Sequence, residues 1–102
     1  MARTPEGAVK AAVKRLLEQH NAYYFMPVSN GMGRHGIPDI IVCHYGHFIA
    51  IECKAKGGKP TALQEREMSS IRLRGGHALV VDDTPETLEA LECLLNQLAH
   101  PQ

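Results

Sequence analysis

The sequence contains no tryptophan, and aromatic residues make up only 5% of its 102 residues. A surface that binds single-stranded nucleic acid mainly by stacking bases on aromatic rings is therefore not expected. No apolar run approaches the roughly 20 residues that span a bilayer, so we expect no membrane partner. The first ten residues also lack the continuous apolar stretch of a signal peptide.

Cysteines are few, with Cys43, Cys53 and Cys93 widely spaced along the chain. An odd number at such spacing argues against a disulfide framework and fits a protein of the reducing cytoplasm. Apolar residues make up 44% of the sequence, which is enough for a buried core. We therefore expect one globular domain over residues 1–102.

The net charge is zero, but bases and acids are unevenly distributed. All 11 lysines and arginines lie between Arg3 and Arg74, where only six acids oppose them, leaving +5. The part from Gly75 onward has five acids and no base, and so carries −5. Such asymmetry can indicate a polyanion-binding face. Charge alone, however, favours a mixed surface with one acidic helix.

Apolar spacing, caps and turn residues divide the chain into seven elements. The expected elements are a helix at 5–20, strands at 22–28, 37–44 and 47–54, a helix at 61–74, a strand at 77–81 and a helix opening at 83–86. Tyr45-Gly46 predicts a two-residue hairpin, and the crossover through the second helix predicts a parallel strand pair. The order α-β-β-β-α-β-α therefore predicts an α/β (α+β) fold with a four-stranded mixed sheet flanked by helices.

Three charged residues converge at one end of the predicted hairpin. Side chains alternate along a strand, so Glu52 and Lys54 share one face. With the turn at Tyr45-Gly46, Asp39 lies opposite Glu52, and like charges so placed repel unless a cation separates them. Hard oxygen ligands suit Mg²⁺ or Mn²⁺. The alternative is a Glu52–Lys54 salt bridge with Asp39 as a turn acid, but the three together favour a metal site with Lys54 acting on a phosphate or water.

The surrounding residues carry a more specific resemblance. Pro38-Asp39, followed 13 positions later by Glu52-Cys53-Lys54, resembles the PD-(D/E)xK nuclease motif. The segments 33–39 and 51–59, with Leu63-Gln64, resemble the VRR-NUC family of virus-type replication–repair nucleases in its small stand-alone form. The similarity runs from about Glu6 to Asp83 and implies a PD-(D/E)xK nuclease-like fold.

The resemblance implies a structure-selective DNA endonuclease that uses Mg²⁺ or Mn²⁺ and cleaves branched DNA such as four-way (Holliday) junctions. It also implies a homodimer, encoded by a phage or prophage and acting in the cytoplasm of the bacterial host. Three alternatives remain: a non-catalytic module that binds branched DNA, a general DNA nuclease without junction preference, and a sequence-specific restriction enzyme. The last usually needs added recognition elements, for which 102 residues leave little room.

The family pattern assigns roles to individual residues. It implies that Asp39, Glu52, the backbone carbonyl of Cys53 and a helical glutamate matched to Glu6 bind the metal. The implied catalytic residues are Asp39, Glu52, Lys54 and Gln64. Gln64 also fits a capping box that begins at Thr61, which explains it equally well.

Helical geometry distinguishes the two glutamates of the first helix. At about 100° per residue, Glu6 falls on the apolar stripe of Val9 and Val13, whereas Glu18 falls roughly 120° from Glu6, on the solvent side. An inward acid needs compensation, which a metal would supply. Glu6 would alternatively remain solvated in the first turn, where it favours the helix dipole.

The predicted DNA contacts are Arg34, His35, Lys56 and Lys59. Arg34 and His35 lie in a Gly31–Gly36 segment that spells GxGxxG, but a strand follows it, so a dinucleotide fold is not favoured. His35 stands where the family often has a second arginine, which makes a phosphate contact there weaker or pH-dependent. Arg66, Arg72 and Arg74 are equally consistent with phosphate contacts and with solvated surface charge.

Two further patterns have competing explanations. Cys43-His44 and His47 contain zinc-binding residue types, but they flank a tight turn without an evident fourth ligand, which favours a hairpin tip. The last helix carries a leucine stripe, formed by Leu88, Leu91, Leu95 and Leu98. This stripe would either form the dimer surface or pack on the sheet of its own chain.

Overall fold

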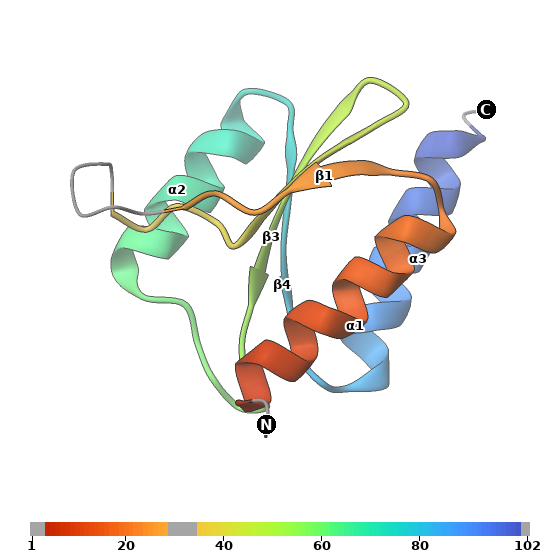
Figure 1. Cartoon of the computed structure of the whole chain (residues 1–102). Helices are drawn as coiled ribbons and strands as arrows, with labels where there is room; N and C mark the ends of the chain where they lie inside the picture. The colour runs from red at the N-terminus through yellow and green to blue at the C-terminus, as the bar shows by residue number, and fades with distance from the viewer. Residues whose placement is uncertain (1–3, 29–34, 101–102) are drawn as a thin grey trace.

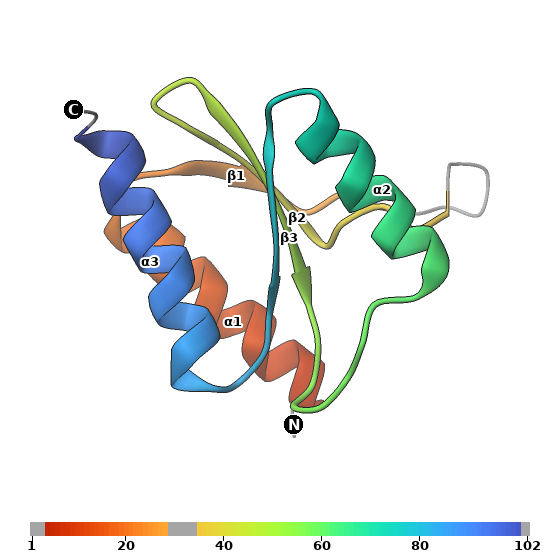
Figure 2. The same ribbon diagram turned by 180° about the vertical axis from the view of Figure 1, so that it is seen from behind.

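The computed structural model describes residues 4–28 and 35–100, in which helices cover both faces of a four-stranded sheet. Helices α1 (Pro5–Gln19) and α3 (Pro85–Ala99) lie on one face, and α2 (Ala62–Leu73) lies on the other (Figures 1 and 2). The strands are β1 (Tyr23–Phe25), β2 (Ile40–His44), β3 (His47–Cys53) and β4 (His77–Val81). The predicted element order and fold class are therefore confirmed. No helix of the described residues has the length and apolar character needed to cross a membrane.

The sheet has the order β1-β2-β3-β4, with antiparallel pairing except between β3 and β4, which are parallel. Ile40 pairs with Ile51 and His44 with His47, so the predicted hairpin register is confirmed. Tyr45 and Gly46 both have positive φ angles, 52° and 82°, as a type I′ turn requires. This turn sets the register that places Asp39, one residue before β2, beside Glu52.

Strands β1 and β2 are several residues shorter than predicted, and β3 is one residue shorter. Strand β1 ends at Phe25, and Pro27 beyond it has no N–H to donate to the ladder. Strand β2 begins at Ile40, because Pro38 lacks a donor and Gly36 adopts φ +81°. A Cβ on Gly36 would lie 2.7 Å from the Leu63 carbonyl carbon, so the segment before Asp39 packs directly on the start of α2.

Capping interactions fix where α1 and α2 begin. Thr4 Oγ1 accepts a hydrogen bond from the Gly7 N–H at 3.0 Å, and Pro5 occupies the first turn of α1. At α2, Thr61 and Gln64 form the predicted capping box. These caps place Glu6 and Gln64 in the first turns of their helices.

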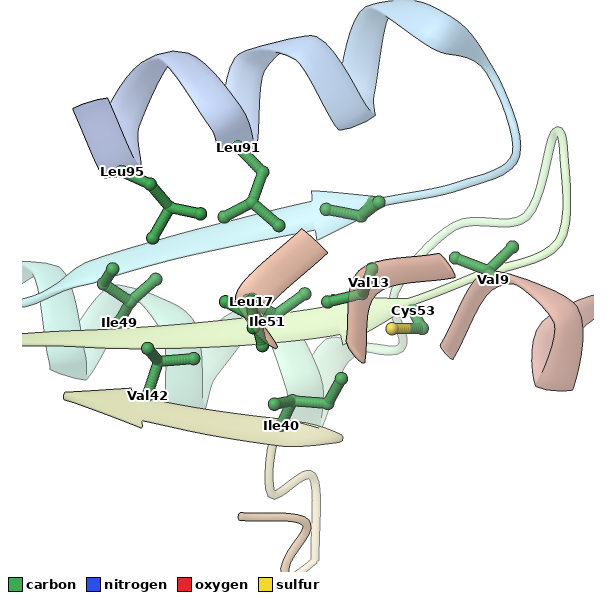
Figure 3. Close-up of a cluster of buried hydrophobic side chains, with 11 residues drawn as sticks. Val9, Val13, Leu17, Ile40, Val42, Ile49, Ile51, Cys53, Leu91 and Leu95 are labelled. Atoms are coloured by element: carbon green, nitrogen blue, oxygen red, sulfur yellow. The ribbon is translucent and has the colours of Figure 1, made fainter. Parts of the chain in front are cut away.

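The larger core cluster lies between the sheet and the pair α1 and α3 (Figure 3). Leu91 and Leu95 are fully buried there, and Leu88 and Leu98 pack at its edge. The leucine stripe therefore packs on the sheet of its own chain. Of the two alternatives from the sequence, packing within the chain is correct and the dimer surface is wrong. His44 is also buried, and its Nε2 donates to the Leu95 carbonyl at 3.1 Å, so it is a satisfied core histidine.

Candidate active site

Two carboxylates meet where β2 begins and β3 ends. Asp39 Oδ2 accepts a hydrogen bond from the backbone N–H of Cys53 at 2.8 Å. Glu52 is only 2% exposed, and its Oε2 accepts from Gln64 Nε2 at 3.0 Å. Its other oxygen, Oε1, is buried without a hydrogen-bond partner in the described part of the chain. While both acids are ionised, this oxygen is buried beside the Asp39 carboxylate without a donor to satisfy it.

The electrostatics of this pair are unfavourable for two ionised acids. Burial, and then the neighbouring Asp39 carboxylate, raise the pKa of Glu52 from 4.5 to about 8, against a smaller opposing effect of Lys54. A divalent cation would offset both the burial of the charge and the repulsion between the acids. Oxygen donors are the ligands that Mg²⁺ and Mn²⁺ prefer. The buried, unpartnered Oε1 beside a second carboxylate therefore fits the cation that the sequence predicts.

Lys54 lies beside the acidic pair, as the strand alternation predicts. Its backbone N–H donates to the Val81 carbonyl at 2.9 Å, which ties the end of β3 to β4. Its Nζ lies 3.8 Å from Glu52 Oε2 and 4.0 Å from Glu6 Oε1. The ammonium is therefore held between a strand carboxylate and a helix carboxylate.

The two glutamates of α1 face different surroundings. Glu6 is partly exposed and approaches Lys54, whereas Glu18 is exposed and accepts a hydrogen bond from the Tyr24 hydroxyl at 2.5 Å. The predicted difference in orientation is confirmed. Among residues 4–28 and 35–100, no three His, Cys, Asp or Glu side chains form a group that could hold a metal ion. Glu6 therefore joins the site through Lys54, and its binding of the metal stays a prediction.

Cys53 presents only its backbone to the site. Its side chain belongs to the core cluster (Figure 3), and burial raises the pKa of the thiol to about 12. The sulfur is therefore neither a thiolate ligand nor a nucleophile at neutral pH. This placement is compatible with the predicted role of the Cys53 carbonyl and excludes one for its side chain.

Gln64 both caps α2 and contacts the acidic pair, the two roles that the sequence leaves open. Its side-chain oxygen accepts from the Thr61 N–H at 2.8 Å, completing the capping box, while its amide nitrogen donates to Glu52. The start of α2 therefore orients the buried carboxylate of β3. Because one side-chain amide makes both hydrogen bonds, Gln64 links the N-terminal cap of α2 to the acidic pair Asp39 and Glu52.

Lys10 belongs to this cluster, although the sequence reasoning did not select it. Its Nζ lies 3.6 Å from Asp39 Oδ1. The available signal was its position four residues after Glu6, since residues with that spacing share a face of a helix. Each acid of the pair thus has its own ammonium: Lys10 for Asp39 and Lys54 for Glu52.

The predicted DNA contacts fall partly outside the described residues, since Arg34 lies there. His35, Lys56 and Lys59 are exposed, and the two lysines lie on the loop that leaves the site end of β3. A cavity of about 210 Å³ adjoins Asp39, and its lining residues are Pro27, Val28, His35, Gly36, Ile37, Pro38 and Asp39.

Two of the arginines considered for phosphate contact make bonds within the chain. The Arg72 guanidinium donates to the Ala78 carbonyl, with its Nη2 at 2.7 Å, and so ties α2 to β4. Arg74 donates to the hydroxyl and the carbonyl of Ser70 in the preceding turn. Both side chains therefore make structural hydrogen bonds, a role that neither of the two alternatives from the sequence includes.

Comparison with known proteins supports the fold and a likeness to nucleases. No protein-family model matches the sequence. A solved structure described as a VRR_NUC domain superposes with a TM-score of 0.74 at 26% identity, covering 88% of this chain and 97% of that one. Over 51 residues, 49% of this chain, the sequence is 41% identical to "Putative nuclease p44" of Acyrthosiphon pisum secondary endosymbiont phage 1. The match spans about half of that relative, 55% of its length. With its element order, its sheet and its ordered motif residues, the chain has the fold of a VRR_NUC domain.

Proposed function

We propose that this protein is an endonuclease that hydrolyses phosphodiester bonds in DNA, with Mg²⁺ or Mn²⁺ held by Asp39, Glu52 and the carbonyl of Cys53. The observation that carries the proposal is the buried, unpartnered oxygen of Glu52 beside the Asp39 carboxylate. A buried acid that is not needed for a cation would be expected to have both oxygens bonded. The VRR_NUC fold and the name of the phage relative support a nuclease.

When bound, the cation would polarise a phosphate oxygen and lower the pKa of a coordinated water. The chain contributes the geometry: the Cys53 N–H holds Asp39, and the Gln64 amide holds Glu52. Lys54 points its ammonium at the same place, where it would stabilise the negative charge that develops on the phosphate. Hydrolysis then forms a bond from water oxygen to phosphorus and breaks one phosphorus–sugar oxygen bond, and the departing oxygen takes up a proton.

DNA would reach the site over the exposed basic positions. We assign Lys56, Lys59 and His35 to backbone phosphates, because all three are exposed, His35 lines the cavity beside Asp39, and the two lysines lie on the loop that follows β3. Arg34 remains an expectation from the sequence. Phosphate contacts position a strand without reading its sequence, which favours structure-selective over sequence-specific cleavage.

We further propose branched DNA, including four-way junctions, as the preferred substrate and a homodimer as the active form. The support is the family resemblance together with symmetry, since a two-fold axis presents two active sites to two strands. The phage relative and the three free cysteines support action in the cytoplasm of a bacterial host.

The test is to incubate the purified protein with end-labelled duplex, flap and four-way-junction DNA, in Mg²⁺, Mn²⁺ or EDTA. We expect cleavage in either metal, none in EDTA, and the fastest cleavage on the junction. Equal rates on all three substrates would indicate a general nuclease. Binding of the junction without cleavage in any metal would indicate a non-catalytic DNA-binding module and would refute the proposal.

A further inference from the structure

Lys10 and Asp39 form a contact that the proposed reaction does not use. The two oxygens of Asp39 have different partners, since Oδ2 is fixed by the Cys53 N–H and Oδ1 lies 3.6 Å from the Lys10 ammonium. Oδ1 accepts no backbone hydrogen bond in the described part of the chain, so it is the oxygen more open to an incoming cation. In the metal-free protein, Lys10 is the positive charge beside it.

The ion pair between Lys10 and Asp39 is one in which a metal cation can replace the lysine. The Lys10 side chain is 34% exposed and the Asp39 side chain 23%, so solvent reaches both. An ammonium on a flexible four-carbon stem makes an ion pair of modest strength when water has access. A divalent cation at Oδ1 brings twice the charge and would displace the ammonium. Repulsion from the bound cation would then direct Lys10 toward the nearest negative charge.

We propose that Lys10 is a displaceable counter-ion: it pairs with Asp39 in the free protein, and when a divalent cation binds it transfers to a backbone phosphate of the bound DNA. This inference rests on the proposed metal site. Lys10 on α1 lies beside Asp39, whereas Lys54 lies beside Glu52. The two ammonium groups would therefore contact the bound DNA strand from different positions in the site. Lys10 would thus link metal binding to DNA binding.

The proposal predicts two effects of opposite sign for Lys10→Gln. Without DNA, the variant should bind Mn²⁺ about two- to five-fold more tightly, because the cation no longer competes with an exposed ion pair. With Mn²⁺ present, the variant should bind DNA more weakly, and the slope of log affinity against log salt should fall by about 0.9, the value for one lost phosphate contact. In EDTA the slope should not change, because Lys10 is then paired with Asp39.

The measurements are calorimetric titration with Mn²⁺ and fluorescence anisotropy with a labelled junction. Anisotropy is measured in the Lys54→Ala background to prevent cleavage. Lys10→Arg keeps the charge and should behave like the parent in the salt slope. Lys14→Gln removes a charge one turn further along α1, roughly 6 Å from the site along the axis, and should change neither quantity. Thermal unfolding of each variant verifies that it is folded.

Unchanged Mn²⁺ affinity in a folded Lys10→Gln protein would overturn the displacement, and an unchanged salt slope in Mn²⁺ would overturn the transfer to phosphate. If Lys10→Gln does not fold, Lys10→Met, which keeps much of the apolar stem, takes its place. A parent protein that binds no Mn²⁺ would overturn the metal site and this inference together. Normal Mn²⁺ binding by the parent with no effect of Lys10 would overturn this inference alone.

Discussion

The buried carboxyl of Glu52 predicts a stability that falls as the pH rises when no metal is present. Its native pKa of about 8 lies above the ordinary 4.5, so the folded chain favours the neutral acid. The stabilising contribution is therefore complete below pH 4.5 and is lost as the pH rises toward 8. Glu52→Gln is neutral at every pH and keeps an oxygen that can accept from Gln64. The variant should escape this loss.

The expected size of the stability loss follows from the raised pKa of Glu52. One pKa unit corresponds to about 1.4 kcal/mol, so the wild type should lose about 2–3 kcal/mol relative to Glu52→Gln between pH 5 and pH 7. Urea titrations of both proteins in EDTA at the two pH values measure this difference. Other titrating groups contribute equally to both proteins, so they cancel in the comparison.

A matched control and a metal titration make the test specific. Glu89→Gln removes an exposed carboxylate from α3 and should leave the pH dependence unchanged. Adding Mn²⁺ at pH 7 should stabilise the wild type more than Glu52→Gln, because binding of the cation favours the ionised acid. If the wild type and Glu52→Gln lose stability in parallel between pH 5 and pH 7, the reasoning about the buried charge is refuted.

Four further predictions concern other parts of the site and the loop before it. Lys54→Ala should lower the cleavage rate by about 10²–10³-fold, yet leave anisotropy-measured DNA affinity nearly intact, because one charge is lost among many phosphate contacts. Asp39→Asn should weaken Mn²⁺ binding roughly ten-fold or more in calorimetry, and unchanged affinity would contradict its role as a ligand. Glu6→Gln should slow turnover severely whereas Glu18→Gln should not; wild-type rates for both would make the α1 glutamates structural only. Gly36→Ala should lower the free energy of unfolding by about 1–3 kcal/mol in urea titration, since φ is +81° and the Leu63 backbone blocks a Cβ; an equally stable variant would show that this loop can move.

The features that the sequence predicts correctly depend on local rules. The two-residue turn at Tyr45-Gly46 sets the hairpin register, and the register alone places Asp39 opposite Glu52. The cap signals at Thr4 and Thr61 likewise depend on neighbours within four residues. Such rules act within one element or one hairpin, so they can be applied before the fold is known.

The features that were missed or left open depend on packing between elements. Alternation places Glu52 on the face of α2, but its burial and raised pKa follow from how α2 covers that face. The direction of the leucine stripe depends on where α3 docks, and the helical spacing of Leu91 and Leu95 is the same for a core and for a dimer.

The Lys10–Asp39 contact shows the same limit at the site itself. Helical spacing puts Lys10 on the face of Glu6, yet only the packing of α1 on the sheet brings its ammonium to Asp39, just before β2. The motif residues are recognised because they lie on the hairpin or carry a family pattern, whereas Lys10 satisfies neither condition. A residue that regulates the charge at such a site is therefore found from the packed structure, because its partner is set by helix docking and not by its own sequence neighbours.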